Sequence, residues 1–131
     1  MTVPRCLVTG VDASAESLAA LDLALELADR LEARLVVVHA VGLLEEGGYR
    51  PRPDLEAIVD DARERVGASE AAVDTVFEDG PPPDVLLRIA EQEAADMLVV
   101  GSRGVSGALR QLGSTSEAVI TGSRIPVLVV P

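Results

Sequence analysis

The most distinctive polar segment of this chain is glycine-rich: GSRGVSG at positions 101–107, followed by GSTSE at 113–117. Gly101 comes directly after an apolar run, and a glycine there allows a ligand to approach the backbone closely. The second part stands where a short helix is expected to begin, and the free amides of a helix start attract anions. Arg103 and Arg110 could offset phosphate charge. The segment predicts a phosphate-binding loop; a plain structural loop is the alternative, since glycine-rich turns are common.

A carboxylate follows another apolar run, near the N-terminus, in the sequence GVDAS at positions 10–14. In open α/β sheets, ligands bind beyond the carboxyl ends of strands, where the winding direction reverses. Both polar segments are therefore expected to face one pocket. Asp12 lies two residues before Ser14, so it is also placed to cap the helix that follows. Both roles stay open at this point.

The elements that must position these segments follow from hydrophobic periodicity. Short Val-rich runs with little polar alternation are typical of strands covered on both faces, and the patterns between them repeat with helical spacing. Strands are expected at Cys6–Val11, Leu35–Val41, Val73–Phe77, Met97–Val100 and Val127–Val130, and helices over 15–32 and 55–66, after Pro81–Pro83, and over 115–121. This order demands parallel strands joined by right-handed helical crossovers. The sequence predicts one α/β domain, residues 1–131, with a doubly wound five-stranded parallel sheet and helices on both faces.

Both ends of the last helix carry a signal. Ser114 and Glu117 form an S-x-x-E capping box, which places the N-cap at Ser114, and Gly122 is placed to end the helix.

The final strand, Val127–Val130, is wholly apolar. At a sheet edge such a strand needs a cover, and pairing with its own copy around a two-fold axis supplies one. The sequence predicts a homodimer formed through this strand.

The composition is strongly acidic, with 22 Asp and Glu against 11 basic residues and a net charge of −11. Such a surface repels nucleic-acid phosphates and anionic membranes, so neither is expected as a partner. All the basic residues are Arg, which excludes a phosphate-binding or Schiff-base lysine. Two origins of the acidity stay open: a halophilic source, where salt screens self-repulsion, and a GC-rich genome that encodes Arg in place of Lys.

The remaining reactive side chains are interpreted as structural. The single cysteine, Cys6, lies in an apolar run, so it predicts a reduced, buried thiol and a cytoplasmic protein. His39 ends the second expected strand without a visible nucleophile or metal partner, so it is interpreted as a satisfied, half-buried residue. No apolar run reaches the ~20 residues of a bilayer span. No catalytic or metal site is predicted from the chain's own residues.

The string GSRGVSGALRQLGSTSEAVI, followed by IPVLVV, resembles the universal stress protein family, as do the opening CLVTGVDASAES and the run LVVVHAV. The likeness spans essentially the whole chain. It implies a Rossmann-like fold of the adenine nucleotide α-hydrolase-like type. Nucleotide-binding members carry G-x2-G-x9-G-[ST] between the fourth strand and fourth helix. Here eight residues, not nine, separate Gly104 from Gly113.

The resemblance also implies roles for individual residues toward ATP, AMP or ADP. The backbone around Val11 and Ala40 would meet the base, and Asp12 would sit beside the ribose and adenine. Other positions would contact the ribose and the phosphates: Val100, Gly101 and Gly104 near the ribose and α-phosphate, and Gly113, Ser114 and Thr115 at the phosphates. Mg or Mn would bridge the phosphates, since hard cations prefer oxygen ligands.

Three functions compete on this sequence. The first is a nucleotide-binding sensor or switch in the stress response, with at most slow ATP hydrolysis because no general base is apparent. The second is a nucleotide-free dimeric interaction module, whose shortened glycine loop no longer binds ATP. The third is an enzyme that adenylates a substrate, for which 131 residues leave little room.

Overall fold

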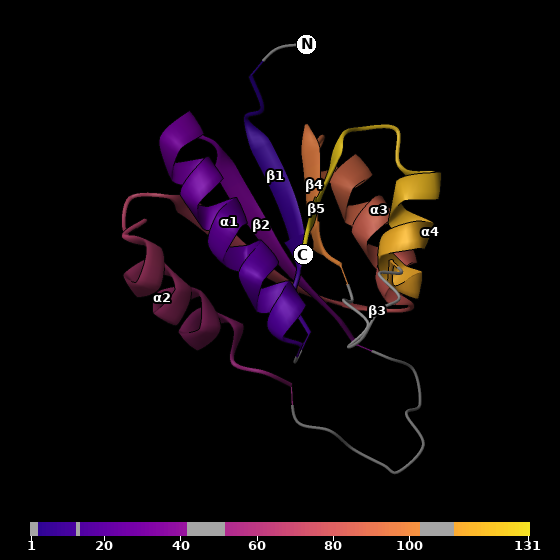
Figure 1. Cartoon of the computed structure of the whole chain (residues 1–131), viewed down its shortest axis with the longest axis horizontal. Coiled ribbons are helices and arrows are strands. Elements are labelled where there is room, and N and C mark those ends of the chain that lie inside the picture. The colour runs from indigo at the N-terminus through magenta and orange to yellow at the C-terminus, as the bar shows by residue number, and fades with distance from the viewer. Residues whose placement is uncertain (1–2, 13, 42–51, 103–111) are drawn as a thin grey trace.

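A computed structural model of the chain describes residues 3–12, 14–41, 52–102 and 112–131. Strands and helices alternate along it (Figure 1). The strands are β1 (Cys6–Gly10), β2 (Arg34–Val41), β3 (Ala72–Asp79), β4 (Met97–Gly101) and β5 (Val127–Val130), and the helices are α1 (Ala15–Leu31), α2 (Leu55–Val66), α3 (Pro82–Gln92) and α4 (Ser114–Gly122). All neighbouring strands are parallel, in the order β3-β2-β1-β4-β5. The predicted doubly wound five-stranded α/β fold is confirmed.

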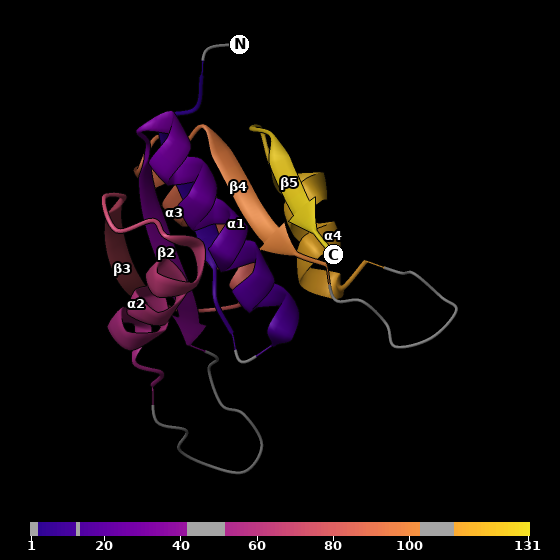
Figure 2. The same ribbon diagram turned by 60° about the vertical axis from the view of Figure 1, so that its left-hand side comes forward.

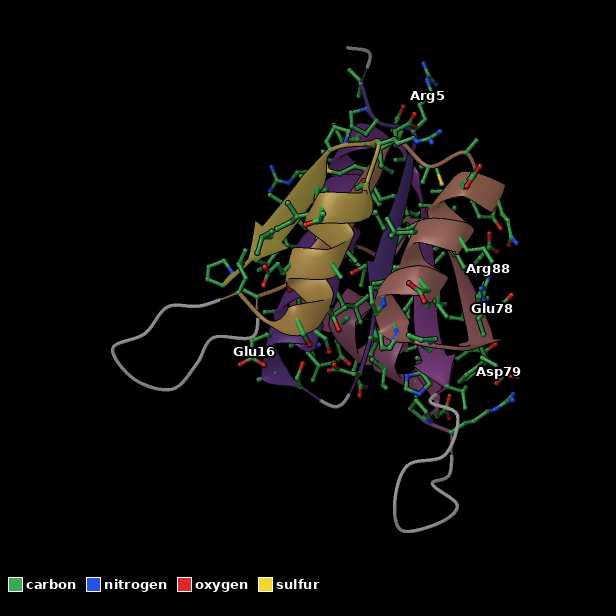
Figure 3. The ribbon with its side chains drawn as sticks, turned by 90° about the vertical axis from the view of Figure 1, so that its right-hand side faces the viewer. Arg5, Glu16, Glu78, Asp79 and Arg88 are labelled. Atoms are coloured by element: carbon green, nitrogen blue, oxygen red, sulfur yellow. The ribbon has the colours of Figure 1, made fainter. Side chains whose placement is uncertain are left out.

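The sheet is covered on both faces, by α1 and α2 on one side and by α3 and α4 on the other (Figures 1 and 2). Arg88 of α3 also reaches the outer edge of the sheet, where it donates a hydrogen bond of 3.2 Å to Glu78 of β3 (Figure 3). Within the described ranges, none of the helices combines the length and the apolar character needed to cross a membrane.

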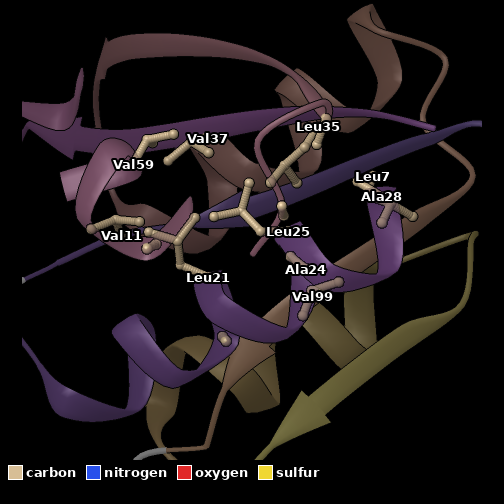
Figure 4. Close-up of a cluster of buried hydrophobic side chains, with 14 of the residues drawn as sticks. Leu7, Val11, Leu21, Ala24, Leu25, Ala28, Leu35, Val37, Val59 and Val99 are labelled. Atoms are coloured by element: carbon tan, nitrogen blue, oxygen red, sulfur yellow. The ribbon is translucent and has the colours of Figure 1, made fainter. Parts of the chain in front are cut away.

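Two hydrophobic cores follow from the alternation of side chains along each strand. Leu7 points to the core shared with Leu21 and Leu25 of α1, and all three are fully buried (Figure 4). Val8, the next residue of β1, points to the opposite core beneath α3, where it packs with Ile89. Both faces of β1 are therefore buried, which explains why its sequence lacks polar alternation.

The winding direction reverses between β1 and β4. From β1 the chain proceeds outward through β2 to β3, and it then crosses to β4 and continues outward to β5. Leu7, Val8 and Thr9 of β1 pair with Met97, Leu98 and Val99 of β4. The crossovers that leave β1 and β4 therefore go to opposite faces of the sheet, and a crevice is expected beyond the carboxyl ends of these two strands.

Several boundaries differ from the sequence-based expectation, and α4 is the most informative. Its N-cap is Gly113, which is extended at φ −65° and ψ 160°, so Ser114 is already the first helical residue. The N–H of Glu117 bonds to the Gly113 carbonyl at 3.0 Å. The predicted capping box at Ser114 is wrong. Gly122 is the last helical residue and Ser123 is the C-cap.

A cluster of polar residues lies at the amino ends of the central strands, at the end of the sheet opposite the crevice. The Asp96 carboxylate accepts hydrogen bonds from the backbone N–H groups of Arg5 and Cys6, at 2.8 and 3.0 Å. Arg34 pairs with Glu93 at 3.0 Å. Burial raises the pKa of the Cys6 thiol, although the nearby Arg34 charge opposes this. Cys6 is therefore a buried, protonated core residue, as predicted.

Candidate functional site

A pocket of about 90 Å³ lies at the carboxyl ends of β1 and β4, where the winding reverses. We call it the switch-point pocket. Its lining comes from the ends of three central strands and from the first turns of three helices or the turns before them: Gly10, Val11, Asp12, Ser14, Glu16, Ser17, Val38, Ala40, Pro82, Leu86, Val100, Gly101, Thr115 and Ser116. The strand ends contribute mainly apolar residues to this lining, and most of its polar residues come from the first turns of α1 and α4. This arrangement suits a ligand with an apolar ring and a polar or anionic end.

The turn from β1 to α1 is fixed by a compact hydrogen-bond network. The Asp12 carboxylate accepts a 2.7 Å bond from the Ser14 N–H, and the Ser14 hydroxyl accepts a 3.2 Å bond from the Ser17 N–H. The Asp12 N–H donates to the buried Ser17 hydroxyl at 3.1 Å. Ser14, and not Asp12, is the N-cap of α1. Asp12 therefore orders the turn while its side chain stays exposed at the pocket.

On the other side of the pocket, Gly101 is the point where α1, β4 and α4 meet. A Cβ atom built on Gly101 would lie 2.6 Å from the backbone carbon and oxygen of Glu16. The Ser116 hydroxyl, which is buried, donates a 2.6 Å hydrogen bond to the Gly101 carbonyl. The first turn of α1 and the first turn of α4 are thus held against the same residue at the end of β4.

The first turn of α4 has backbone N–H groups that no acceptor in the described part of the chain satisfies. Gly113 provides no side-chain cap, and the N–H groups of residues 114–116 have no partner within the described part of the chain. Such amides, together with the positive end of the helix dipole, favour an anionic group. Thr115 and Ser116 lie on the pocket side of this turn.

His39 fixes the backbone at the base of the pocket. Its Nδ1 atom lies 2.8 Å from the Val11 carbonyl oxygen, and the Val11 N–H donates to Val38 at 2.8 Å. The imidazole also packs edge-on against Phe77, with the ring centroids 6.0 Å apart. His39 is half-buried and partnered, as predicted from the sequence.

The structure brings together most of the predicted site residues. Six of them line the pocket: Val11, Asp12, Ala40, Val100, Gly101 and Thr115. Gly113 and Ser114 lie at the start of α4 but are not part of the lining. Arg103 and Gly104 lie outside the described residues, as do Arg110 and Gly107.

Eight lining residues were not singled out in the sequence as ligand contacts, although Gly10, Ser14 and Ser116 lie in the two polar segments expected to face the pocket. The eight are Gly10, Ser14, Glu16, Ser17, Val38, Pro82, Leu86 and Ser116. One signal for some of them was available. The third helix was predicted to begin after Pro81–Pro83, and the first turn of a helix that follows a strand of an open α/β sheet points toward the ligand crevice. The same signal applies to Glu16, which lies in the first turn of the helix after β1, but an acidic residue there is already expected from the helix dipole.

The described lining is negatively charged. It contains the carboxylates of Asp12 and Glu16, and among its described members there is no arginine or histidine. The described residues also contain no group of three His, Cys, Asp or Glu side chains arranged to hold a metal ion.

Fold and pocket together define a doubly wound α/β domain with its ligand crevice at the point where the winding reverses. The sequence profile of the universal stress protein family matches residues 5–131. The chain is 32% identical to universal stress protein Rv1636 of Mycobacterium tuberculosis, over 99% of this chain and 98% of the relative. It is 28% identical to universal stress protein YxiE of Bacillus subtilis, over 95% and 97% of the two chains.

A solved structure of a universal stress protein in complex with cAMP is also similar, with a TM-score of 0.77, 29% identity and 99% coverage of both chains. The protein belongs to the universal stress protein family. The resemblance seen in the sequence is therefore confirmed over nearly the whole chain.

Proposed function

We propose that this protein binds an adenine nucleotide in the switch-point pocket and acts as a nucleotide-dependent sensor or switch in the stress response. One observation carries the proposal. The carboxylate-bearing turn after β1 and the first turn of α4, whose leading amides have no partner among the described residues, line one pocket. The cAMP complex of a relative that is 29% identical to this chain supports it.

In this proposal each side of the pocket has its own task. The backbone at Val11 and Ala40 contacts the base, and Asp12 accepts hydrogen bonds from the ribose hydroxyls. Gly101 lets the sugar and the first phosphate pass close to the end of β4. Thr115 and its neighbours at the start of α4 hold phosphate. Arg103 and Gly104 are assigned to the phosphate side as well.

In this proposal a divalent ion binds in the switch-point pocket only together with the nucleotide. The pocket supplies oxygen donors from Asp12, Glu16 and Thr115, the ligand type that Mg²⁺ and Mn²⁺ prefer. Two carboxylates are fewer than a protein-only site normally uses, so phosphate oxygens would complete the coordination. Bound in this way, the ion would neutralise phosphate charge.

Isothermal titration calorimetry with cAMP, AMP and ATP, each with and without Mg²⁺, tests the proposal. We expect saturable binding of at least one adenine nucleotide, with a Kd below about 1 mM, which corresponds to roughly 4 kcal/mol or more of binding free energy. Guanosine nucleotides serve as the matched control for base recognition. The absence of binding heat up to millimolar adenine nucleotide would reject the proposal. It would favour the nucleotide-free interaction module, for which the shortened glycine loop is the supporting observation.

We further infer a cytoplasmic homodimer that pairs through β5, which is an edge strand of the sheet formed by the described residues. The Leu98 N–H donates to the Pro126 carbonyl, and the Ser102 N–H donates to the Val130 carbonyl. Even-numbered residues of β5 therefore bond to β4, and the backbone groups of Val127 and Val129 point away from it. The buried thiol of Cys6 supports the reducing location.

Substitution Val129→Pro removes one outward N–H group without touching the bonds to β4. We expect it to shift the protein from dimer to monomer in sedimentation velocity at micromolar concentration, while nucleotide binding persists. Val129→Thr keeps the N–H and the β-branched shape, so it should remain a dimer. A wild-type protein that sediments as a monomer would contradict the inference.

A further inference from the structure

We propose that the outer edge of β3 is a docking site for an extended, cationic segment of another protein, which adds to the sheet as an antiparallel strand. In this segment basic residues alternate with apolar ones. The inference is independent of the proposed function, because it concerns the edge of the sheet opposite β5 and requires no nucleotide. It depends on the outward backbone groups of β3 and on the pattern of its side chains.

Hydrogen-bonding groups of the β3 backbone point away from the sheet. β3 is an edge strand of the sheet formed by the described residues, and the Gly80 N–H donates to the Val41 carbonyl at 3.1 Å. Because the backbone groups of successive residues alternate in direction, the even-numbered residues of β3 bond to β2. The N–H and C=O groups of Val73, Thr75 and Phe77 therefore point outward, and they have no partner in the part of the chain that the structure describes.

The side chains of β3 form two rows between residues 73 and 78, because successive residues point to opposite faces of the sheet. Val73 and Phe77 belong to the row that packs partly against the core beneath α1. Asp74 and Glu78 belong to the other row, with Val76 between them. No residue of β3 is buried, so an added strand can contact both rows. Directly opposite residues of an antiparallel pair share a face, so apolar residues of the segment would meet the first row and basic residues the second.

Carboxylates outnumber the arginines along this edge. Asp74, Glu78 and Asp79 all lie on β3. Arg88 pairs with Glu78 at 3.2 Å and donates a 3.4 Å bond to the Asp79 carbonyl, and Figure 3 shows these three residues at the outer edge. The outward groups open to a partner therefore end before residue 79. Arg34 lies 4.0 Å from Asp74, whose side chain is 72% exposed.

Arg34 offsets the charge of Asp74 only weakly, because its guanidinium group is bound to another residue. It donates to the Glu93 side chain at 3.0 Å and to the Glu93 carbonyl at 2.9 Å. The net charge of −11 over the whole chain adds to the attraction for a cation. A basic side chain opposite Asp74 would therefore meet an exposed carboxylate in acidic surroundings.

The acidic row argues against a second copy of the chain as the occupant of this edge. Pairing two β3 strands around a two-fold axis would place the acidic rows of both copies side by side on one face of the sheet. Like charges on opposite strands destabilise a sheet, and charged edge residues are a usual means of preventing self-association. β5, by contrast, has no charged residue between Val127 and Val130. The β3 edge is therefore complementary to a cationic strand and not to itself.

Fluorescence anisotropy with a short labelled peptide that alternates Lys or Arg with Val tests the proposal. We expect saturable binding to the wild type with a Kd below about 100 μM, an affinity within reach of strand addition. A control peptide of the same composition carries all its basic residues before all its valines, and it should bind at least about fivefold more weakly. Raising NaCl from about 0.1 to 1 M shortens the Debye length from about 10 to 3 Å and should weaken binding of the alternating peptide.

N-methylation of the peptide backbone tests strand addition directly on the wild-type protein. In an antiparallel pair, valines opposite Val73 and Phe77 exchange N–H and C=O bonds with β3, whereas the N–H groups of the basic residues point to solvent. Methylation of the valine nitrogens should therefore lower the affinity at least about tenfold, since several hydrogen bonds are lost. Methylation of the nitrogens of the basic residues should change it less than about threefold.

Variants of the protein test the same edge from the other side. Thr75→Pro removes an outward N–H group and leaves the bonds to β2 in place, so we expect it to weaken peptide binding at least about fivefold. Thr75→Val keeps the N–H and is its matched control. Asp74→Asn should weaken binding about threefold, as expected for an exposed charge pair. Glu117→Gln makes the same change in charge at an exposed position of α4, which packs beside β5, and should leave binding unchanged.

Weaker binding of the valine-methylated peptide and of Thr75→Pro supports the inference. Equal affinities for the alternating peptide and its control, or for the two methylated peptides, would show only a general attraction between a cation and an acidic protein and would overturn it. The absence of saturable binding to the wild type in about 0.1 M NaCl would overturn it as well. If Thr75→Pro does not fold, the two methylated peptides decide the question on the wild type. No nucleotide is present in these assays, so none of the outcomes bears on the proposed function.

Discussion

Replacing Gly101 by alanine is expected to abolish adenine-nucleotide binding and to lower the free energy of unfolding by about 2–3 kcal/mol, within the usual cost of overpacking. The added methyl would lie 2.6 Å from the backbone carbon and oxygen of Glu16. Backbone atoms cannot rotate away as the end of a side chain can, so α1 must shift from β4. The shift also disturbs the carbonyl that accepts the 2.6 Å bond from Ser116.

Urea denaturation and calorimetric titration on the same preparation measure the two effects separately. Gly67→Ala is the matched control, because Gly67 caps the C-terminus of α2 with a positive φ of 70° and no atom within 4 Å of an added Cβ. It should cost about 1 kcal/mol through backbone strain and leave ligand affinity unchanged. A Gly101→Ala protein that binds nucleotide with wild-type affinity would show that Gly101 does not shape the pocket.

The order of the elements could be predicted because burial on both faces leaves a direct mark on the sequence. The residues at which the strands end were harder to predict, and β3 shows the reason. It was expected to end at Phe77, yet it continues to Asp79, with Glu78 and Asp79 paired to Ala40 and Val41 of β2. An edge strand needs only backbone bonds on one side, so acidic side chains do not end it.

The chemistry at the start of α4 shows where local motifs mislead. Ser114 and Glu117 match the capping-box spacing, but the helix starts one residue earlier with Gly113 as its N-cap. The serine that matters is Ser116, whose hydroxyl bonds across to Gly101. That bond joins two residues that are 15 positions apart in the sequence. No sequence pattern within either segment predicts this contact.

The same reasoning explains why Glu16 was missed while Asp12 was found. Asp12 stands directly after a predicted strand, so the rule that ligands bind at strand ends applies to it. Glu16 lies inside a helix, where an acidic residue in the first turn is expected simply from the helix dipole. Its place in the pocket follows from the missing side chain of Gly101, which lets α1 approach β4.

Asp12→Ala is expected to weaken adenine-nucleotide binding about 10- to 100-fold, because a hydrogen bond to a charged group contributes about 1.5–3 kcal/mol. The substitution removes the proposed ribose acceptor, and it also removes the carboxylate that accepts the 2.7 Å bond from the Ser14 N–H. Loss of that second bond should lower the free energy of unfolding by about 1 kcal/mol.

Asp12→Asn separates the two roles, since its amide oxygen can still accept the bond from Ser14 while its charge is lost. We expect Asp12→Asn to keep the wild-type stability and to weaken binding less than Asp12→Ala does. Asp22→Ala removes an equivalent carboxylate from α1, one that pairs with Arg65 of α2 at 2.8 Å outside the pocket, and it should leave binding unchanged. Equal affinities in all three variants and the wild type would exclude Asp12 from the ligand site.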